Sequence, residues 1–222
     1  MAEVKKTFSI KGMHCASCVS LIERSLKNVD GVKNAAVNLA TQKASVSYDP
    51  SKISDSRLAS AIANVGYKAL IGEETETEDE EQKEKRRELK MLKVKVTVSL
   101  ILGGLILWGS FPGLMATAPA FLHNFWLQLI FATPVQFWAG WGFYRAAIAA
   151  LKHRTANMDT LVAIGTTVAY GYSVFVTVLP HAVQGAGLES IPYFDTSTII
   201  IGLILLGRYF EARAKAGTSE AI

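Results

Sequence analysis

Two cysteines, Cys15 and Cys18, are the residues of this chain best suited to chemistry. They are the only cysteines among 222 residues, and both lie in the string GMHCASC at positions 12–18. Two thiols three positions apart can converge on one ion, and the N-terminus of a helix favours their thiolate forms. Soft thiolates without a nearby carboxylate select soft ions such as Cu(I) over hard divalent cations. The motif therefore predicts capture of a soft metal ion.

Other interpretations of the cysteine motif are less well supported. Zn(II) prefers four ligands, whereas the loop offers two certain ones, with His14 as a third candidate that is more often a loop-surface residue. Met13 is expected to pack beneath the loop. A thioredoxin-like redox pair normally has a proline between its cysteines, which is absent here. A buried or idle pair is the remaining structural interpretation, and metal capture is favoured over it.

The residues around the cysteines alternate between strand and helix patterns. Residues 4–11 alternate apolar and polar side chains as a half-buried strand does, and residues 16–28 carry apolar positions at helical spacing. The elements expected after these are strands over 32–39 and 44–48, a helix capped by Ser54 or Asp55 and ended by Gly66, and a strand over 67–71. The order β-α-β-β-α-β predicts an α+β ferredoxin-like domain over residues 1–72, with the cysteines where the first strand meets the first helix.

Residues 73–92 are expected to be a charged linker. Nine of the 19 acidic residues fall between Glu73 and Glu88, and basic residues follow them. A solvated linker that runs into a helix is favoured over a docking tail. The net charge of +4 says little about partners because its sign changes along the chain. No basic stripe with interleaved aromatic residues indicates nucleic-acid binding.

Residues 93–222 are expected to form an all-α transmembrane four-helix region. The range Val96–Tyr144 contains no Asp, Glu, Lys or Arg. Segments close to the roughly 20 residues that cross a hydrocarbon core predict helices at about 93–111, 125–150, 160–180 and 191–213. Lys and Arg flank one set of helix ends and are absent from the opposite loops, 112–124 and 181–192. The positive-inside rule then puts both termini in the cytosol and predicts a multi-pass protein of the lipid bilayer.

Several strings carry a resemblance to a known family. Besides the cysteine loop they are FY at 143–144, ANMDTL at 156–161 and GRYFE at 207–211. Residues 3–72 resemble a heavy-metal-associated domain of the Cu(I)-binding kind, and residues 91–222 resemble the beginning of a bacterial copper-transporting P-type ATPase. Residues 215–222 are similar to the stretch that leads into the actuator domain of that family. The chain is thus identified as resembling the N-terminal portion of such a pump.

The resemblance implies a path for the metal. Cys15 and Cys18 would capture Cu(I), and Met158 and Glu211 would accept it at the cytosolic mouth of the membrane region, with a third acidic ligand from a later segment. Without the resemblance, a lone methionine is more often packing and a carboxylate at this depth is either interfacial or functional. The resemblance also implies Ag(I) as a second candidate cargo, a cytosolic copper chaperone as a candidate partner, and the bacterial inner membrane as the location.

The family also has a kink and a platform in this region. Its second span breaks at a Gly-Gly pair and continues as an amphipathic platform along the membrane surface. Here the pair reads Ala139-Gly140, so the first glycine is missing and Gly142 is an alternative source of flexibility. The cationic residues of the expected platform are Arg145, Lys152 and Arg154. Two roles are equally favoured for them. One is docking of a chaperone or of the metal-loaded N-terminal domain, residues 1–72, called the head below, and the other is plain positive-inside anchoring.

Three polar residues of the membrane region receive structural interpretations. Asn157 and Asp159 are expected to cap the third span rather than bind metal. Asp195 is expected to be a solvated carboxylate at the outer interface, which is favoured over an exit-side metal group.

Motifs for ATP chemistry are missing from the sequence. It contains no Cys-Pro-Cys, Thr-Gly-Glu or Asp-Lys-Thr-Gly, and no glycine-rich phosphate loop. We therefore expect no ATP hydrolysis by this chain alone, and ATP and Mg²⁺ would be needed only by a full-length pump. The favoured hypothesis is the N-terminal part of an ATP-driven Cu(I) export pump. The alternative is a stand-alone or split-subunit copper-binding membrane protein without hydrolytic activity.

Overall fold

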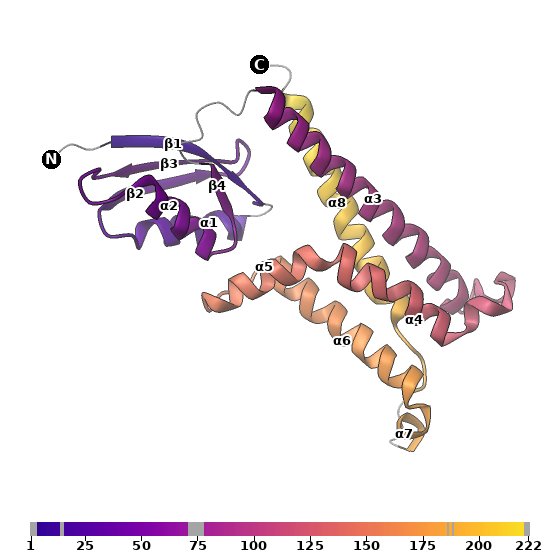
Figure 1. The fold of residues 1–222 in the computed structure, drawn as a ribbon. Helices are drawn as coiled ribbons and strands as arrows, with labels where there is room; N and C mark the ends of the chain where they lie inside the picture. The colour runs from indigo at the N-terminus through magenta and orange to yellow at the C-terminus, as the bar shows by residue number, and fades with distance from the viewer. Residues whose placement is uncertain (1–3, 14–15, 71–77, 186, 188, 220–222) are drawn as a thin grey trace. The chain divides into compact units, whose positions relative to one another are not determined.

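The computed structural model describes residues 4–13, 16–70, 78–185, 187 and 189–219. Its first compact unit is built around an N-terminal α+β domain, and its second is built around a set of long helices. Figure 1 shows the elements of both in chain order.

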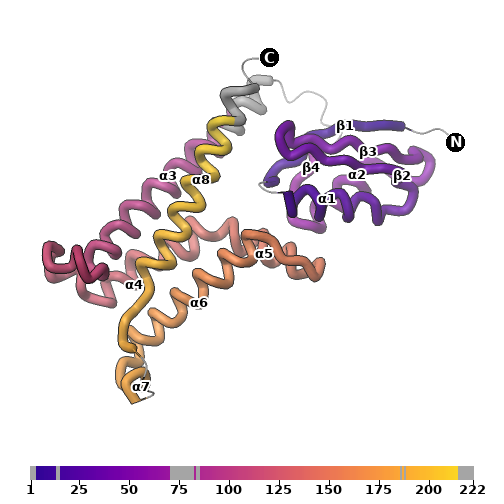
Figure 2. The backbone as a smooth tube through the Cα atoms, turned by 180° about the vertical axis from the view of Figure 1, so that it is seen from behind, coloured from indigo at the N-terminus to yellow at the C-terminus, as the bar shows by residue number. Residues whose placement is uncertain are grey.

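The N-terminal domain has the predicted ferredoxin-like topology. Its elements are β1 (Val4–Lys11), α1 (Ala16–Lys27), β2 (Val32–Asn38), β3 (Lys43–Tyr48), α2 (Asp55–Asn64) and β4 (Lys68–Leu70). The strands form one sheet in the order β2-β3-β1-β4, and all three neighbouring pairs are antiparallel. Both helices cover the same face of this sheet (Figures 1 and 2). The prediction of a βαββαβ domain is confirmed.

Periodic apolar residues fix the faces of these elements. In β1, the alternating residues Phe8 and Ile10 are buried, as the period of two in a strand requires. In α1, Ile22 and Leu26 lie one turn apart and are fully buried, and Leu58 plays the same part in α2. Full burial of each such side chain stabilises the fold by roughly 1.5–3 kcal/mol. The core therefore lies between the sheet and the two helices, directly behind the end of β1.

The start of α2 differs in one detail from the expectation. Ser54 occupies the N-cap position with an extended backbone, but its side chain makes no capping hydrogen bond. Its hydroxyl lies 2.9 Å from the hydroxyl of Ser56 instead. Asp55, the other expected cap, is bonded to residues of the sheet. The predicted position of the helix start is right, while the predicted capping role of these side chains is wrong.

The second half of the chain is helical. In order its elements are α3 (Glu78–Ser110), η1 (Met115–Thr117), η2 (Ala120–His123), α4 (Phe125–Pro134), η3 (Val135–Ala139), α5 (Trp141–Lys152), α6 (Met158–Val178), α7 (Pro180–Gly185) and α8 (Phe194–Ser219). Helices α3 and α8 run side by side in both views (Figures 1 and 2). A Cβ atom on Gly202 would lie 3.1 Å from Leu100 of α3, so a small residue lets the two helices approach closely.

Helix α3 begins inside the segment expected to be a linker. It runs without interruption from Glu78 to Ser110, whereas the sequence predicted a linker over 73–92 and a helix from residue 93. Glu, Lys, Arg, Gln and Leu dominate the string EDEEQKEKRRELK, and all of them have high helix propensity. Charge density marked this segment as polar, but it did not exclude a helix.

Two helices of the described residues are long and apolar enough to cross a membrane. They are Arg86–Ser110 of α3 and Met158–Val178, which is α6. The segment predicted over 125–150 is divided into α4, a π-helical turn and α5. Helix α8 carries Asp195 in its first turn and Arg208 near its middle. Four spans and a cytosolic location of both termini stay predictions.

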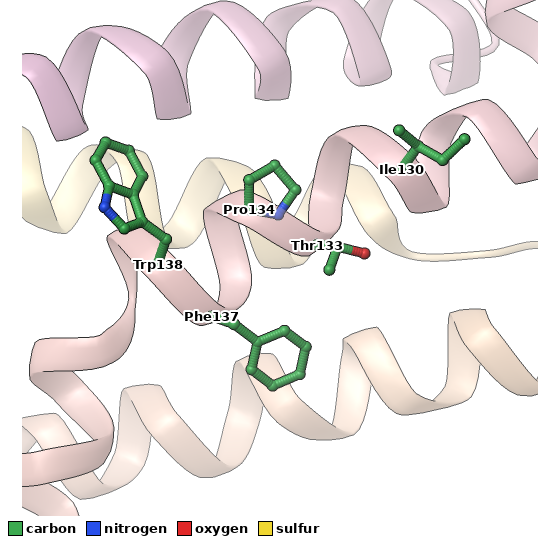
Figure 3. Close-up of a pocket in the computed structure, with 5 residues that line it drawn as sticks. All are labelled: Ile130, Thr133, Pro134, Phe137 and Trp138. Carbon is green, nitrogen blue, oxygen red and sulfur yellow. The ribbon is translucent and has the colours of Figure 1, made fainter.

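Helix α4 and the turn after it carry an exposed apolar groove. Figure 3 shows its five lining residues, Ile130, Thr133, Pro134, Phe137 and Trp138. The polar side-chain groups of these five residues are the Thr133 hydroxyl and the indole nitrogen of Trp138. The Thr133 hydroxyl donates to the carbonyl of Leu129 at 2.7 Å. Such a surface suits lipid chains or another helix and offers nothing to a metal ion.

Candidate metal centres

The first candidate centre lies where β1 meets α1. Gly12, the first residue of the string GMHCASC, follows β1 with φ +95°, a backbone conformation that favours glycine. Cys18 is the third residue of α1, and its side chain is 2% exposed. The strand–helix junction thus places Cys18 in the first turn of α1. Cys15 and His14 lie outside the described residues.

The base of this loop is held from a distant turn. Met13 is fully buried, as expected of a residue that packs beneath the loop. Gln42, in the turn between β2 and β3, accepts a hydrogen bond from the backbone of Ile10 at 2.8 Å. Its side-chain amide also donates to the carbonyl of Met13 at 3.5 Å. Because Gln42 is 29 residues away from Met13 in sequence, no local pattern could have indicated this support.

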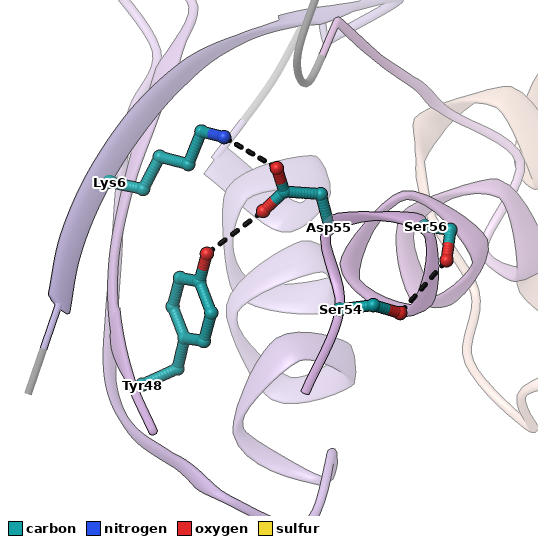
Figure 4. A network of polar contacts seen from close by, with 5 residues as sticks. All are labelled: Lys6, Tyr48, Ser54, Asp55 and Ser56. Atoms are coloured by element: carbon teal, nitrogen blue, oxygen red, sulfur yellow. Dashed lines mark hydrogen bonds and ion pairs between the residues drawn. The ribbon is translucent and has the colours of Figure 1, made fainter. Parts of the chain in front are cut away.

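A second polar contact ties β1 to α2 on the helix-covered side of the sheet. Lys6 Nζ lies 2.5 Å from Asp55 Oδ2, and the hydroxyl of Tyr48 donates to Asp55 Oδ1 at 2.8 Å (Figure 4). These two hydrogen bonds, from Lys6 and then from Tyr48, lower the pKa of Asp55. Burial, followed by the bond to Asp55, raises the pKa of Tyr48. The contact links β1 and β3 to the start of α2.

The second candidate centre lies where α6 begins and α8 approaches its end. Met158 is the first residue of α6 and its side chain is 44% exposed. Glu211 is half-buried on α8. The two helices contact each other and are antiparallel, because the backbone N–H of Tyr193 donates to Ser173 Oγ at 2.6 Å near their other ends. The first residue of α6 and the last third of α8 therefore lie at the same end of the pair.

A buried ion pair joins α6 to α8 at this end. The guanidinium group of Arg208 donates to the carboxylate of Asp159, and their side chains are only 12% and 8% exposed. The guanidinium carbon of Arg208 also lies 4.4 Å from the centre of the Phe143 ring, which is a cation–π contact. Asp159 was expected to cap the third span. It lies instead in the first turn of α6, with its carboxylate engaged by α8.

The break after α4 requires Gly140. The amide of Gly140 donates to the carbonyl of Val135 at 2.9 Å, five residues back, which closes the π-helical turn. A Cβ atom at Gly140 would lie 2.5 Å from the carbonyl oxygen of Gln136, whereas one at Gly142 would have no atom within 4 Å. The close approach is therefore at Gly140, and Gly142 is not needed for it.

Polar side chains on the inner side of this break link it to α6. Gln136 is fully buried, and its amide nitrogen donates to the hydroxyls of Tyr144 at 2.6 Å and Thr166 at 3.1 Å. The hydroxyl of Tyr144 lies 2.8 Å from that of Thr167. Sequence reasoning missed Gln136, and its only signal was an amide in a long uncharged stretch.

The cationic residues of the expected platform are all exposed. Arg145 and Lys152 lie on α5, and Arg154 follows it. Helix α5 ends where the amide of Thr155 bonds to the carbonyl of Ala150, and Arg154 there adopts a left-handed φ of +53°. This is the C-terminal motif usually made by glycine. Arg154 therefore occupies a backbone conformation that favours glycine over residues with a side chain.

The described residues contain no group of three or more His, Cys, Asp and Glu side chains placed to hold a metal ion together. Of the cysteine loop, residues 12–13 and 16–18 are described, and Cys15 is not. The second candidate centre consists of one thioether at the start of α6 and one carboxylate on α8. Arg208 and Phe143 belong to strings that were noted in the sequence, but the contacts of Arg208 with Asp159 and with Phe143 were not predicted.

Comparison with known proteins gives one domain match and matches over the whole chain. Residues 7–68 match the model of the heavy-metal-associated domain family. The chain is 39% identical over 222 residues to the copper-exporting P-type ATPase of Bacillus subtilis (strain 168), covering 98% of this chain and 27% of that protein. It is 41% identical over 221 residues to the copper-exporting P-type ATPase of Staphylococcus aureus (strain Newman), covering 96% and 26%. The chain spans about a quarter of the length of these relatives.

Solved structures match the N-terminal domain. The N-terminal domain of a potential copper-translocating P-type ATPase from Bacillus subtilis, solved in its Cu(I)-loaded state, is 40% identical. It covers 35% of this chain and 95% of that chain, with a TM-score of 0.31.

Proposed function

Because residues 7–68 are a heavy-metal-associated domain and the chain is homologous over nearly its whole length to bacterial copper-exporting P-type ATPases, we propose that it performs the Cu(I)-accepting steps of such an exporter. One observation carries the proposal. The similarity covers 98% of the chain, so it extends well beyond the metal-binding head into the helices. A small soluble carrier would share only the head.

The first step is capture of Cu(I) by Cys15 and Cys18. Cu(I) is a soft ion that thiolates bind in preference to oxygen ligands. The position of Cys18 in the first turn of α1 and the support of the loop by buried Met13 both favour a site that is preformed on one side. Ag(I), which has the same softness and charge, is the second cargo of this site.

The second step is acceptance of Cu(I) by Met158 and Glu211. The thioether is a soft ligand, and the carboxylate adds charge that a monovalent cation needs when it leaves water. The exposure of Met158 at the start of α6 favours this role over packing. A third, acidic ligand would come from a later segment. The positive-inside rule orients this end toward the cytosol, with both termini on the same side of a bacterial inner membrane.

The exposed cations Arg145, Lys152 and Arg154 are proposed to form a docking surface. A copper-loaded head or a cytosolic copper chaperone would dock there before it releases the ion, and Gly140 would set the break that turns α5 away from α4. The remaining steps need ATP and Mg²⁺ and motifs that this sequence does not contain. They would belong to the rest of a full-length pump.

X-ray absorption at the copper edge tests the two steps separately. With one equivalent of Cu(I), the chain should show two sulfur neighbours and no oxygen neighbour. In a Cys15→Ser, Cys18→Ser variant, the remaining copper should show one sulfur and at least one oxygen neighbour. Loss of that sulfur in a further Met158→Leu variant would support the entry site. Nitrogen and oxygen neighbours alone in the unsubstituted chain would contradict the proposal.

A further inference from the structure

The ion pair between Asp159 and Arg208 is adjacent to both proposed entry ligands. Asp159 directly follows Met158 in α6, and Arg208 precedes Glu211 by three residues in α8. Three residues are about 4.5 Å along a helix and most of one turn. Each partner of the ion pair is therefore the near neighbour of one proposed ligand.

The direction of the helices places both ligands on one side of the pair. Because α6 and α8 are antiparallel, the step from Asp159 back to Met158 and the step from Arg208 on to Glu211 point the same way. A shift of one helix along the other would separate the two ligands. The ion pair opposes such a shift, since a buried guanidinium cannot lose its carboxylate without a large penalty.

Phe143, which belongs to α5, contacts the guanidinium group of Arg208 and restricts its position. The ring is 2% exposed, and it lies 4.4 Å from the guanidinium carbon of Arg208. The Nε atom of Arg208 is buried without a hydrogen-bond partner among the described residues. The side chain is thus fixed by one carboxylate and one ring face, which come from α6 and α5.

Resting on the proposed function, we infer that Asp159 and Arg208 are positioning residues of the Cu(I) entry site. The pair sets the register of α6 against α8 so that the Met158 thioether and the Glu211 carboxylate can meet one ion. It also cancels a permanent positive charge that would otherwise stand one turn from the ligands and repel an incoming cation. Neither residue touches the metal.

The test uses the whole chain with Cys15→Ser and Cys18→Ser, so that the head is silent. Cu(I) affinity is measured by competition with a chromophoric Cu(I) chelator, and the neighbours of the bound copper by X-ray absorption. The main variant is Asp159→Asn with Arg208→Gln, which removes both charges and leaves no unpaired ion in the interior. Arg208→Lys keeps the charge. Asp195→Asn is the matched control, because this α8 carboxylate accepts its hydrogen bond from the adjacent Thr196.

The double variant should keep its helical circular dichroism and yet bind Cu(I) about 10–100 times more weakly, as expected for loss of the groups that orient metal ligands. Its copper should also lose either the sulfur or the oxygen neighbour. Asp195→Asn should stay close to the parent. Arg208→Lys keeps the charge but loses the planar guanidinium group and its contact with Phe143, so its Cu(I) affinity should fall between those of the parent and the double variant. If the double variant loses helical signal, Phe143→Leu provides the test, since it leaves both charges paired and should still weaken Cu(I) binding.

Two results would overturn the inference. The first would contradict only the positioning role, and the second would also contradict the proposed entry site. Unchanged affinity and unchanged copper neighbours in the folded double variant, or in Phe143→Leu, would leave the entry site intact and exclude a positioning role. Absence of Cu(I) binding in the parent, or binding that Met158→Leu and Glu211→Ala do not alter, would remove the entry site itself.

Discussion

Asp159 at the start of α6 and Arg208 on α8 form a buried ion pair, although they are 49 residues apart in sequence. The pair links the two helices that carry the proposed entry ligands. Charges buried in this way are stabilising only while both are present, because each one alone would be left without solvation.

Breaking the ion pair from one side should destabilise the helical region. Arg208→Met or Asp159→Ala leaves one buried charge unpaired, at an expected cost of about 3–5 kcal/mol. Asp159→Asn combined with Arg208→Gln should cost clearly less than either single change. Unfolding in mixed detergent micelles, followed by circular dichroism, gives the comparison. Equal losses in the single and double variants would contradict a buried pair.

Replacing Gly140 should disturb the break between α4 and α5. The Cβ atom of Gly140→Ala would lie 2.5 Å from the carbonyl of Gln136, so we expect destabilisation of about 1–3 kcal/mol from overpacking. Gly142→Ala is the matched control, since nothing lies within 4 Å of its added atom. That change should be neutral or stabilising by up to about 1 kcal/mol through helix propensity. The same unfolding measurement distinguishes them, and the reverse ranking would place the break elsewhere.

The stability of the head should fall in acid partly through Asp55. Hydrogen bonds from Lys6 and Tyr48 lower its pKa in the folded head below the ordinary 3.8. The contribution is therefore complete above the unfolded pKa and is lost as pH falls through the lower folded value. The side chains of Lys6 and Asp55 are both more than a third exposed, so their ion pair contributes only about 0.2–1 kcal/mol to the stability of the head.

Residues 1–72 are suitable for this measurement because the buried core of the head lies entirely between Phe8 and Val65. Urea unfolding from pH 6 to pH 2 should show a smaller acid-induced loss in Asp55→Asn than in the unsubstituted domain. An identical pH dependence in the two would show that Asp55 contributes nothing.

Substitutions of Cys18 should separate metal binding from folding. Its side chain is 2% exposed in the head core, so Cys18→Ala should abolish tight Cu(I) binding by residues 1–72 with a small change in stability. Cys18→Ser brings a hydroxyl into an apolar environment and should cost about 1–3 kcal/mol more. Thermal unfolding and Cu(I) titration of both variants test this. A serine variant as stable as the alanine variant would mean that the side chain is not in the core.

Regular elements could be predicted from the sequence because their faces are periodic. The alternation around Phe8 and Ile10 and the helical spacing of Ile22 and Leu26 both report burial on one side, and the βαββαβ order followed from them. The start of α3 at Glu78 was missed, because a charged face looks the same on a solvated helix and on a linker.

Features that depend on contacts between distant segments could not be predicted. The resemblance suggested a kink near Ala139-Gly140, but only the carbonyl of Gln136 shows why Gly140 is the necessary glycine. The partner of Asp159 was hidden in the same way, since a carboxylate in the first turn of a helix reads as a cap until the facing helix is known.

Anaerobic titration of the whole chain with Cu(I), in competition with a chromophoric chelator, tests the central claim most directly. We expect one tight equivalent that disappears in the Cys15→Ser, Cys18→Ser variant, and a weaker one that persists there and is lost with Met158→Leu and Glu211→Ala. Tight binding that survives removal of both cysteines, or a chain that binds Cu(I) no better than Zn(II), would contradict the assignment of this protein to Cu(I) acceptance.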